Sequence, residues 1–197
     1  VDDLLRKIAM LRFIGQETGT CFQRCVGLDG LNAICSVTFE LDQARGTDYH
    51  RRFQQFLARV QREDLMCAGA MTDVKGDRSL APWKQADPDL YVRIVARRAD
   101  GIVIRGAKTH ITGAVNSHEI LVMPTFGVPP EGADWAVACA VPIDAPGVTL
   151  VFGRQSNDER KEEQGIDCGT SFGVVGGEST ILFEDVFVPT ERVFMAG

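Results

Sequence analysis

The sequence lacks the features that mark membrane-spanning, nucleic-acid-binding and secreted proteins. It has no run of about 18 apolar residues, so we expect no membrane span and no membrane partner. The formal net charge is -6 and the lysines and arginines are scattered, which disfavours nucleic acid as a partner because phosphate binding needs clustered cations. The acidic start, Val1-Asp2-Asp3, does not resemble a signal peptide. A cytoplasmic protein is the resulting expectation.

A dinucleotide-binding fingerprint and a disulfide framework are absent as well. No Gly-x-Gly-x-x-Gly follows a predicted strand, so a Rossmann-type site is not supported. Six cysteines in 197 residues are too few for a small secreted scaffold held by disulfides. Because 45% of the residues are apolar and 24% are charged, the chain can bury a core without such bridges. We therefore expect free or metal-bound thiols in a reducing compartment.

The order of the predicted elements indicates an α+β fold. Apolar residues recur at helical spacing in three early segments, near residues 4–11, 21–32 and 53–60. Asp100-Gly101 lies between two β-prone runs, a pattern typical of a hairpin. Further strands are predicted over residues 120–123, 136–141, 148–152 and 180–183. Helices followed by strands favour two segregated domains, residues 1–66 and 67–197.

Cys21 and Cys25 form the sharpest chemical motif, in the sequence Cys-Phe-Gln-Arg-Cys. Two cysteines four apart on a helix project from the same face, so both thiolates could ligate one metal centre. Cysteine is also a common buried residue at helix interfaces, and on spacing alone both roles stay open. The other four cysteines have no motif spacing and are predicted to be structural: Cys35, Cys67, Cys139 and Cys168.

Two polar segments that contain glycine could hold a cofactor. The first, residues 69–78, lies at the boundary between helices and strands, where backbone N–H groups can approach a planar ring or a phosphate. Its Lys75 and Arg78 could face a pyrophosphate. The second, residues 105–119, contains two of the three histidines, which can act as bases near neutral pH. A solvated connection and a strand end that reaches water remain the respective alternatives.

Taken in order, these segments resemble the 4-hydroxybutyryl-CoA dehydratase family, within the wider group of 4-hydroxyphenylacetate 3-hydroxylase-like flavoproteins. The resemblance covers nearly the whole chain and rests on residues 21–27, 69–78, 87–90, 100–108, 116–119 and 153–156, and on the glycines before Glu178. It implies an acyl-CoA dehydrogenase-like architecture. Residues 1–66 would end the N-terminal helical domain and residues 67–197 would form the middle antiparallel β-domain, with the C-terminal helical bundle absent from this sequence.

The resemblance also implies cofactors and the residues that hold them. Cys21 and Cys25 would supply two of the four ligands of a 4Fe-4S cluster, and a His and a Cys beyond this sequence would supply the others. Gln23, Thr112 and Glu178 would act at the catalytic centre. FAD would contact a larger set of residues in the middle domain: Met71, Thr72, Asp73, Lys75, Gly76, Asp77, Arg78, His110, Thr112 and Asn116.

The implied activity is the radical dehydration of a CoA thioester, 4-hydroxybutyryl-CoA, to crotonyl-CoA by a homo-tetramer that is also a vinylacetyl-CoA delta-isomerase. In this scheme the flavin removes one electron, which makes the C3 hydrogen acidic, and the cluster assists loss of the hydroxyl as a Lewis acid. Two alternatives stay open. One is an FAD-dependent aromatic hydroxylase of the 4-hydroxyphenylacetate 3-monooxygenase type, which needs no iron. The other is a non-catalytic truncated fragment.

Overall fold

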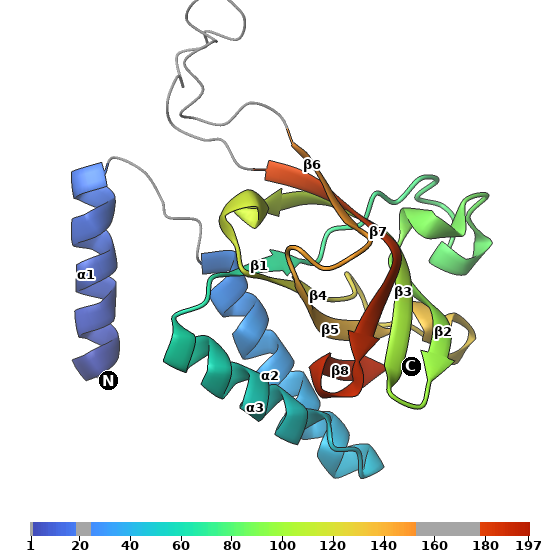
Figure 1. The fold of residues 1–197 in the computed structure, drawn as a ribbon, viewed down its shortest axis with the longest axis horizontal. Helices are drawn as coiled ribbons and strands as arrows, with labels where there is room; N and C mark the ends of the chain where they lie inside the picture. The colour runs from blue at the N-terminus through green and yellow to red at the C-terminus, as the bar shows by residue number, and fades with distance from the viewer. Residues whose placement is uncertain (1, 19–24, 153–177) are drawn as a thin grey trace, which may run out of the picture.

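The computed structural model describes residues 2–18, 25–152 and 178–197 of the chain. Within these residues helices precede strands, which confirms the predicted α+β class (Figure 1). None of the helices in this described part is both long and apolar enough to cross a bilayer. The α-helices are α1 (Asp2–Thr18), α2 (Cys25–Arg45) and α3 (Tyr49–Glu63). Short 3-10 helices follow at η1 (Pro82–Lys84), η2 (Pro88–Leu90), η3 (Ala114–Asn116), η4 (Pro130–Trp135) and η5 (Thr190–Arg192).

The described strands form two four-stranded sheets. The first has the order β1-β4-β5-β8, with strands at Cys67–Ala70, Glu119–Val122, Val137–Pro142 and Val193–Ala196. The second has the order β2-β3-β7-β6, with strands at Arg93–Arg98, Gly101–Thr112, Glu178–Pro189 and Val148–Phe152. The strands of the second sheet are antiparallel, whereas β1 and β4 pair in parallel. The expected antiparallel β-domain therefore contains a parallel pair.

The local strand signals of the sequence are confirmed. Arg98 pairs with Gly101 at the expected hairpin turn. The strands predicted elsewhere occur within one residue of their expected bounds as β4, β5 and β6, and the fourth is the middle of the longer β7. Sequence reasoning does not foresee β1, because Cys-Ala-Gly-Ala lacks the β-branched and aromatic residues typical of strands.

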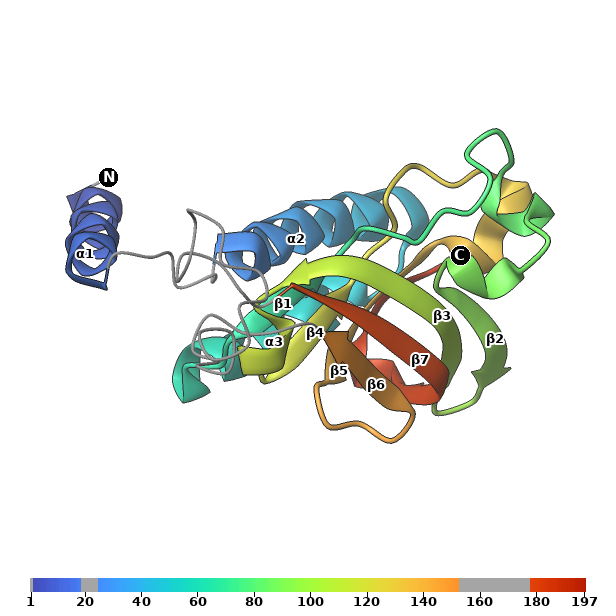
Figure 2. The ribbon, with the colours of Figure 1, turned by 90° about the horizontal axis from the view of Figure 1, so that it is seen from above.

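Apolar clusters fill the space on both faces of the first sheet. α2 and α3 cover one face, where the rings of Phe53 and Phe194 meet edge to face with centroids 5.5 Å apart. The second sheet covers the other face, and Ile120 shares a cluster there with Phe183. Figure 2 shows β2, β3, β7 and β6 side by side on the side of the molecule away from α1. The helices thus share a core with the first sheet, so apolar packing crosses the proposed domain boundary at residue 66.

α1 differs from α2 and α3 because none of its described apolar side chains is buried. Figures 1 and 2 both show it set apart from the two sheets. It contributes no described residue to the apolar clusters. Its exposed large side chains are Leu5, Ile8, Met10, Leu11 and Phe13.

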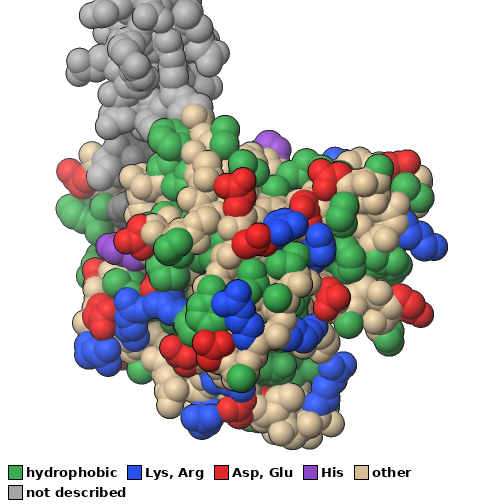
Figure 3. Space-filling model, turned by 45° about the vertical axis from the view of Figure 1, so that its right-hand side comes forward, with side chains coloured by type: hydrophobic (Ala, Val, Ile, Leu, Met, Phe, Trp, Pro, Cys, Tyr) green, Lys and Arg blue, Asp and Glu red, His purple; other side chains and the backbone are tan. Residues whose placement is uncertain are grey.

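The charged surface mixes both signs. On the face drawn in Figure 3, lysine and arginine side chains are interspersed with aspartate and glutamate. One such pair is bidentate: Arg105 donates to the two carboxylate oxygens of Asp185 at 2.9 and 2.8 Å. On this face the surface agrees with the scattered basic residues of the sequence and offers no broad cationic stripe.

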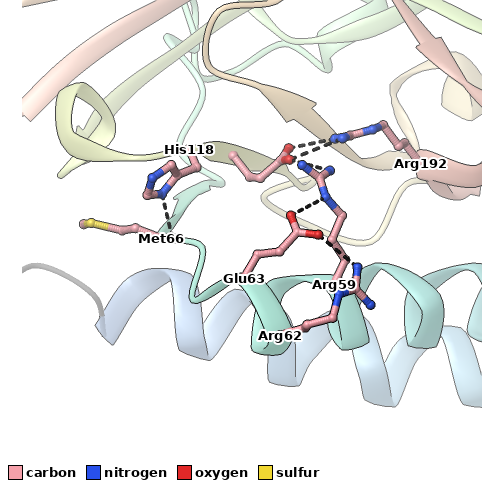
Figure 4. Close-up of polar contacts among 7 residues, drawn as sticks. Arg59, Arg62, Glu63, Met66, His118 and Arg192 are labelled. Carbon is pink, nitrogen blue, oxygen red and sulfur yellow. Dashed lines mark hydrogen bonds and ion pairs between the residues drawn. The ribbon is translucent and has the colours of Figure 1, made fainter.

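A buried carboxylate joins the helices to the first sheet. Glu119, at the start of β4, is almost fully buried and accepts hydrogen bonds from Arg59 of α3 at 3.1 Å and from Arg192 of η5 at 2.7 Å. Figure 4 shows these two arginines converging, and it shows Glu63 bound by Arg59 at 3.0 Å and by Arg62 at 2.9 Å. A buried carboxylate is tolerated only when its charge and lone pairs are matched, and Arg59 and Arg192 do this for Glu119.

We predict that Glu119→Ala lowers the free energy of unfolding by about 3 kcal/mol, because two guanidinium groups lose a buried partner. Glu63→Ala is the matched control: it removes an arginine-bound carboxylate from the exposed end of the same cluster, where solvent already screens the charges. Urea denaturation of both variants should show a much smaller loss for the control. Equal losses of unfolding free energy in the two variants would contradict the conclusion that the buried Glu119 stabilises the fold more than the exposed Glu63 does.

Candidate functional site

The segment after β1 lies against β3 of the other sheet. The N–H of Thr109 donates to the carbonyl of Thr72 at 2.9 Å, and Asp73 forms an antiparallel bridge with Lys108. Farther along, the N–H of Val74 donates to the carbonyl of Leu90 at 3.2 Å. The first half of the predicted cofactor segment is therefore held by antiparallel backbone pairing with β3, so its start is the part nearest to Thr112.

A buried lysine fixes the start of this segment. The Lys108 side chain is 2% exposed, and its Nζ donates to the carbonyls of Met71 and Met123, each at 2.8 Å, and to Asp73 Oδ1 at 2.5 Å. Thr125 Oγ1 lies 2.7 Å from the Met71 carbonyl and is also within hydrogen-bonding distance of the other Asp73 oxygen, so its one proton can be donated to either. Burial lowers the pKa of Lys108, and the Asp73 carboxylate opposes that shift. The Asp73 side chain, predicted to contact a cofactor, thus points into the protein.

The middle of the segment makes a tight turn. Lys75 and Gly76 have φ values of 79° and 54°, in the left-handed region that favours glycine. The Tyr91 hydroxyl donates to the Lys75 carbonyl at 3.3 Å. A Cβ added to Gly76 would lie 2.5 Å from Leu90 Cδ1, so no larger residue fits there without a shift. Lys75 is half-buried at this turn.

The end of the segment is tied to η1. The Gln85 side chain accepts from the N–H of Asp77 at 3.1 Å and donates to the Asp77 carbonyl at 2.7 Å. Hydrogen bonds from Ser79 lower the pKa of the Asp77 carboxyl. Asp77 and Arg78 are exposed. Residues 71–78 therefore form a defined loop with a cation at its exposed end.

The structure brings three of the predicted site residues together where β3 ends and β7 begins. Thr112 Oγ1 donates to Glu178 Oε1 at 3.0 Å, and His110 Nδ1 lies 3.2 Å from Glu178 Oε2. The β3–β7 register shifts between Lys108 and Ile111, and His110 has a φ of 54° in that bulge. Such bulges re-aim side chains near functional sites. A hydroxyl, an imidazole and a carboxylate in contact can hold and transfer a proton.

The remaining predicted residues lie around this group or outside the description. Asn116 is exposed on η3, four residues after Thr112. Cys21 and Gln23 lie outside the described residues, as does Cys168. Sequence reasoning assigns no role to Lys108 or Thr125. The sequence does contain a signal for Lys108. This lysine lies in a strand near Gly106, Ala107 and Ile111, and a charged side chain among such small and apolar residues needs a partner.

Glycine contacts place the start of α2 directly on β1. A Cβ added to Gly27 would lie 1.9 Å from the carbonyl oxygen of Cys67, and one added to Gly69 would lie 2.8 Å from Val26 Cγ1. α2 begins at Cys25, two residues before Gly27. The backbone of Cys25 is therefore close to the strand that leads into the 71–78 loop.

The described cysteines of the core do not form a metal site. Among residues 2–18, 25–152 and 178–197, no three His, Cys, Asp or Glu side chains are arranged to hold an ion. Cys67 and Cys139 lie in the apolar clusters. Burial raises the pKa of Cys139 to about 12, so it is a neutral thiol and a poor ligand. These placements agree with the structural role expected for both.

Comparisons with known proteins identify the family of this chain. Residues 1–195 match the family model for the 4-hydroxyphenylacetate 3-hydroxylase N terminal. The chain is 51% identical over 195 residues to 4-hydroxybutyryl-CoA dehydratase/vinylacetyl-CoA-Delta-isomerase of Clostridium aminobutyricum, a match that covers 98% of this chain and 40% of that protein.

Solved structures agree. An oxygen-tolerant archaeal 4-hydroxybutyryl-CoA dehydratase from N. maritimus superimposes with a TM-score of 0.88 and 49% identity, over 100% of this chain and 39% of that one. The oxygenase component of 4-hydroxyphenylacetate 3-monooxygenase complexed with FAD gives a TM-score of 0.67 and 25% identity, over 86% of this chain and 34% of that one. The chain thus spans at most 40% of the length of these three relatives. The resemblance seen in the motifs is confirmed, and the chain belongs to the 4-hydroxyphenylacetate 3-hydroxylase N-terminal family.

Proposed function

We propose that this chain forms part of a lyase/isomerase that dehydrates 4-hydroxybutyryl-CoA to crotonyl-CoA and shifts the double bond of vinylacetyl-CoA. The observation that carries the proposal is 51% identity, over 98% of the chain, to a dehydratase with both activities in its name. The contact of Glu178 with Thr112 and His110 supports it, because a dehydratase must move protons. The complete enzyme is proposed to be a homo-tetramer.

FAD is the first proposed cofactor, held by the 71–78 loop and the end of β3. The close fit around Gly76 shapes a compact turn, and Lys75 and Arg78 can offset the charge of a pyrophosphate. Since Lys108 and Thr125 occupy the Asp73 carboxylate, we assign Asp73 a backbone contact only. The proposed flavin contacts are Met71, Thr72, Asp73, Lys75, Gly76, Asp77, Arg78, His110, Thr112 and Asn116.

A 4Fe-4S cluster is the second proposed cofactor, with Cys21 and Cys25 as two of its four ligands. Thiolates are the usual protein ligands of such clusters. The packing of Gly27 and Gly69 supports the assignment, because it brings the Cys25 backbone beside the strand that feeds the flavin loop. A His and a Cys outside this chain would complete the set. Residues 1–66 would then serve the cluster and residues 67–197 the flavin.

The residues of this chain are proposed to handle the protons of the reaction. When bound, the flavin takes and returns one electron, and the cluster polarises the leaving hydroxyl. Glu178 accepts a proton from the substrate, while the Thr112 hydroxyl and the His110 imidazole hold its two oxygens in place. Gln23, between the two cysteines, would face the CoA thioester.

A second candidate is an FAD-dependent hydroxylase acting on a phenol. The family description and the FAD-bound oxygenase structure favour it. It requires no iron, so the cysteine pair would have no catalytic use. Identity is the discriminating observation: 49% to the dehydratase structure against 25% to the oxygenase structure.

We predict that the complete polypeptide, purified without oxygen, contains flavin and iron and converts 4-hydroxybutyryl-CoA to crotonyl-CoA. The products are separated by liquid chromatography and identified by mass. Vinylacetyl-CoA should give the same product. If the loaded protein turns over neither thioester, the dehydratase assignment is wrong, and hydroxylation of a phenol with reduced flavin and oxygen would establish the second candidate.

We predict that Cys21→Ser and Cys25→Ser each lose most of the bound iron and sulfide while keeping flavin, because a cluster with three protein ligands is held poorly. Cys35→Ser, a half-buried cysteine on the same helix as Cys25, is the control and should retain iron. Iron, sulfide and flavin are quantified per subunit. Similar iron contents in all three variants would rule out the proposed ligands.

We predict that Glu178→Gln lowers kcat by about 100-fold or more, because an amide cannot accept the proton. Its near-identical shape should preserve flavin content. Glu184→Gln is the matched control, since Glu184 is an exposed glutamate on the same strand, β7. Steady-state rates of both variants with 4-hydroxybutyryl-CoA provide the measurement. A control that loses as much activity as Glu178→Gln would remove the case for a specific proton acceptor.

A further inference from the structure

Lys108 is a buried charge that the proposed mechanism does not use. A lysine with 2% side-chain exposure is rare, because removing an ammonium from water is costly unless every proton finds an acceptor. Here the three Nζ protons match three acceptors: the carbonyls of Met71 and Met123 and the carboxylate of Asp73. Tyr91 and Trp135 line the same small pocket as the Lys108–Asp73 pair.

The three acceptors belong to two segments that lie far apart in the sequence. Met71 and Met123 follow the parallel strands β1 and β4, which pair up to Ala70 and Val122. Lys108 belongs to β3, in the other sheet. One ammonium therefore joins the ends of two strands of the first sheet to a strand of the second.

These three hydrogen bonds of Lys108 fix the distance between the two halves of the proposed flavin site. The 71–78 loop leaves the first sheet at Met71, whereas Thr112 and His110 lie on β3, within four residues of Lys108. Thr125 reinforces this connection, because its hydroxyl lies within hydrogen-bonding distance of both the Met71 carbonyl and the Asp73 carboxylate. If Lys108 were absent, backbone pairing at Thr72 and Thr109 would remain, but the Met123 carbonyl would lose its Lys108 donor and the Met71 carbonyl would keep only the Thr125 hydroxyl.

We propose that Lys108 is a positioning residue for the flavin: it sets the 71–78 loop against the end of β3, so that both can contact one cofactor. This inference rests on the proposed flavin site. A buried ion pair adds little net stability compared with apolar residues of the same volume, so stability alone does not account for this one. The directional hydrogen bonds from Lys108 to the carbonyls of Met71 and Met123 do account for the buried lysine.

The test compares FAD binding by the complete polypeptide in four forms: wild type, K108M/D73N, K108R and R192M. The double variant removes both buried charges and leaves neither unpaired. K108R keeps the charge, but a planar guanidinium cannot place one nitrogen among three acceptors. R192M is the control, since it breaks the Glu119 cluster, which lies outside the flavin site. Circular dichroism and size-exclusion chromatography establish folding.

We expect the folded double variant and K108R to bind FAD about tenfold more weakly or worse, with altered visible absorption bands of the bound flavin, as for other residues that orient a site's contacts. R192M should melt at a lower temperature yet keep the wild-type dissociation constant and bands. A purely structural Lys108 would lower only the melting temperature.

Wild-type affinity and bands in a folded K108M/D73N or K108R protein would overturn this inference and leave the flavin proposal standing. If the double variant does not fold, K108R alone decides. If the wild-type polypeptide binds no FAD, the proposed flavin site fails, and the role of Lys108 fails with it.

Discussion

The parallel pairing of β1 with β4 is the constraint on which the candidate site depends. Parallel neighbours end at the same edge of a sheet, so the chain leaves both strands side by side, at Met71 and at Met123. The Met123 N–H donates to the Ala70 carbonyl at 3.1 Å and extends the pairing by one step. Beyond that step the two carbonyls need donors from elsewhere, because buried backbone acceptors are rarely left unpaired. Lys108 supplies them, and this brings β3 to the same edge.

β3 and β7 extend from the apolar core to the polar group formed by Thr112, His110 and Glu178. Both strands are twelve residues long, and their inner parts, such as Ile104 and Val186, are fully buried. Thr112 and Glu178 pair at the far end, where exposure increases and polar groups are tolerated. The bulge at His110 adds an imidazole to the same carboxylate. The buried interior thus fixes a polar end, which suits the proton-accepting role proposed for Glu178.

Sequence alone predicts what is local and misses what depends on distant partners. The Asp100-Gly101 hairpin is encoded by adjacent residues, so it is found where expected. The pairing of β1 with β4 joins segments about fifty residues apart, and the small residues of β1 give no periodic signal. The family resemblance places Asp73 among the residues that contact FAD. Only the fold shows that Lys108, 35 residues later, draws its carboxylate inward.

The β-part of the structure does not by itself separate a dehydratase from a hydroxylase, because one fold can serve both chemistries. The proposed flavin loop and the positioning role proposed for Lys108 suit either reaction. The proposed cluster, which only the dehydratase would need, depends instead on the start of α2. Gly27 lets the helix backbone touch the Cys67 carbonyl, at a separation that any side chain would prevent. The contact seats the start of α2, where the Cys25 backbone lies, on the strand that leads into residues 71–78. A cluster bound by Cys25, as proposed, would be held against the β-domain by this contact of α2 with β1.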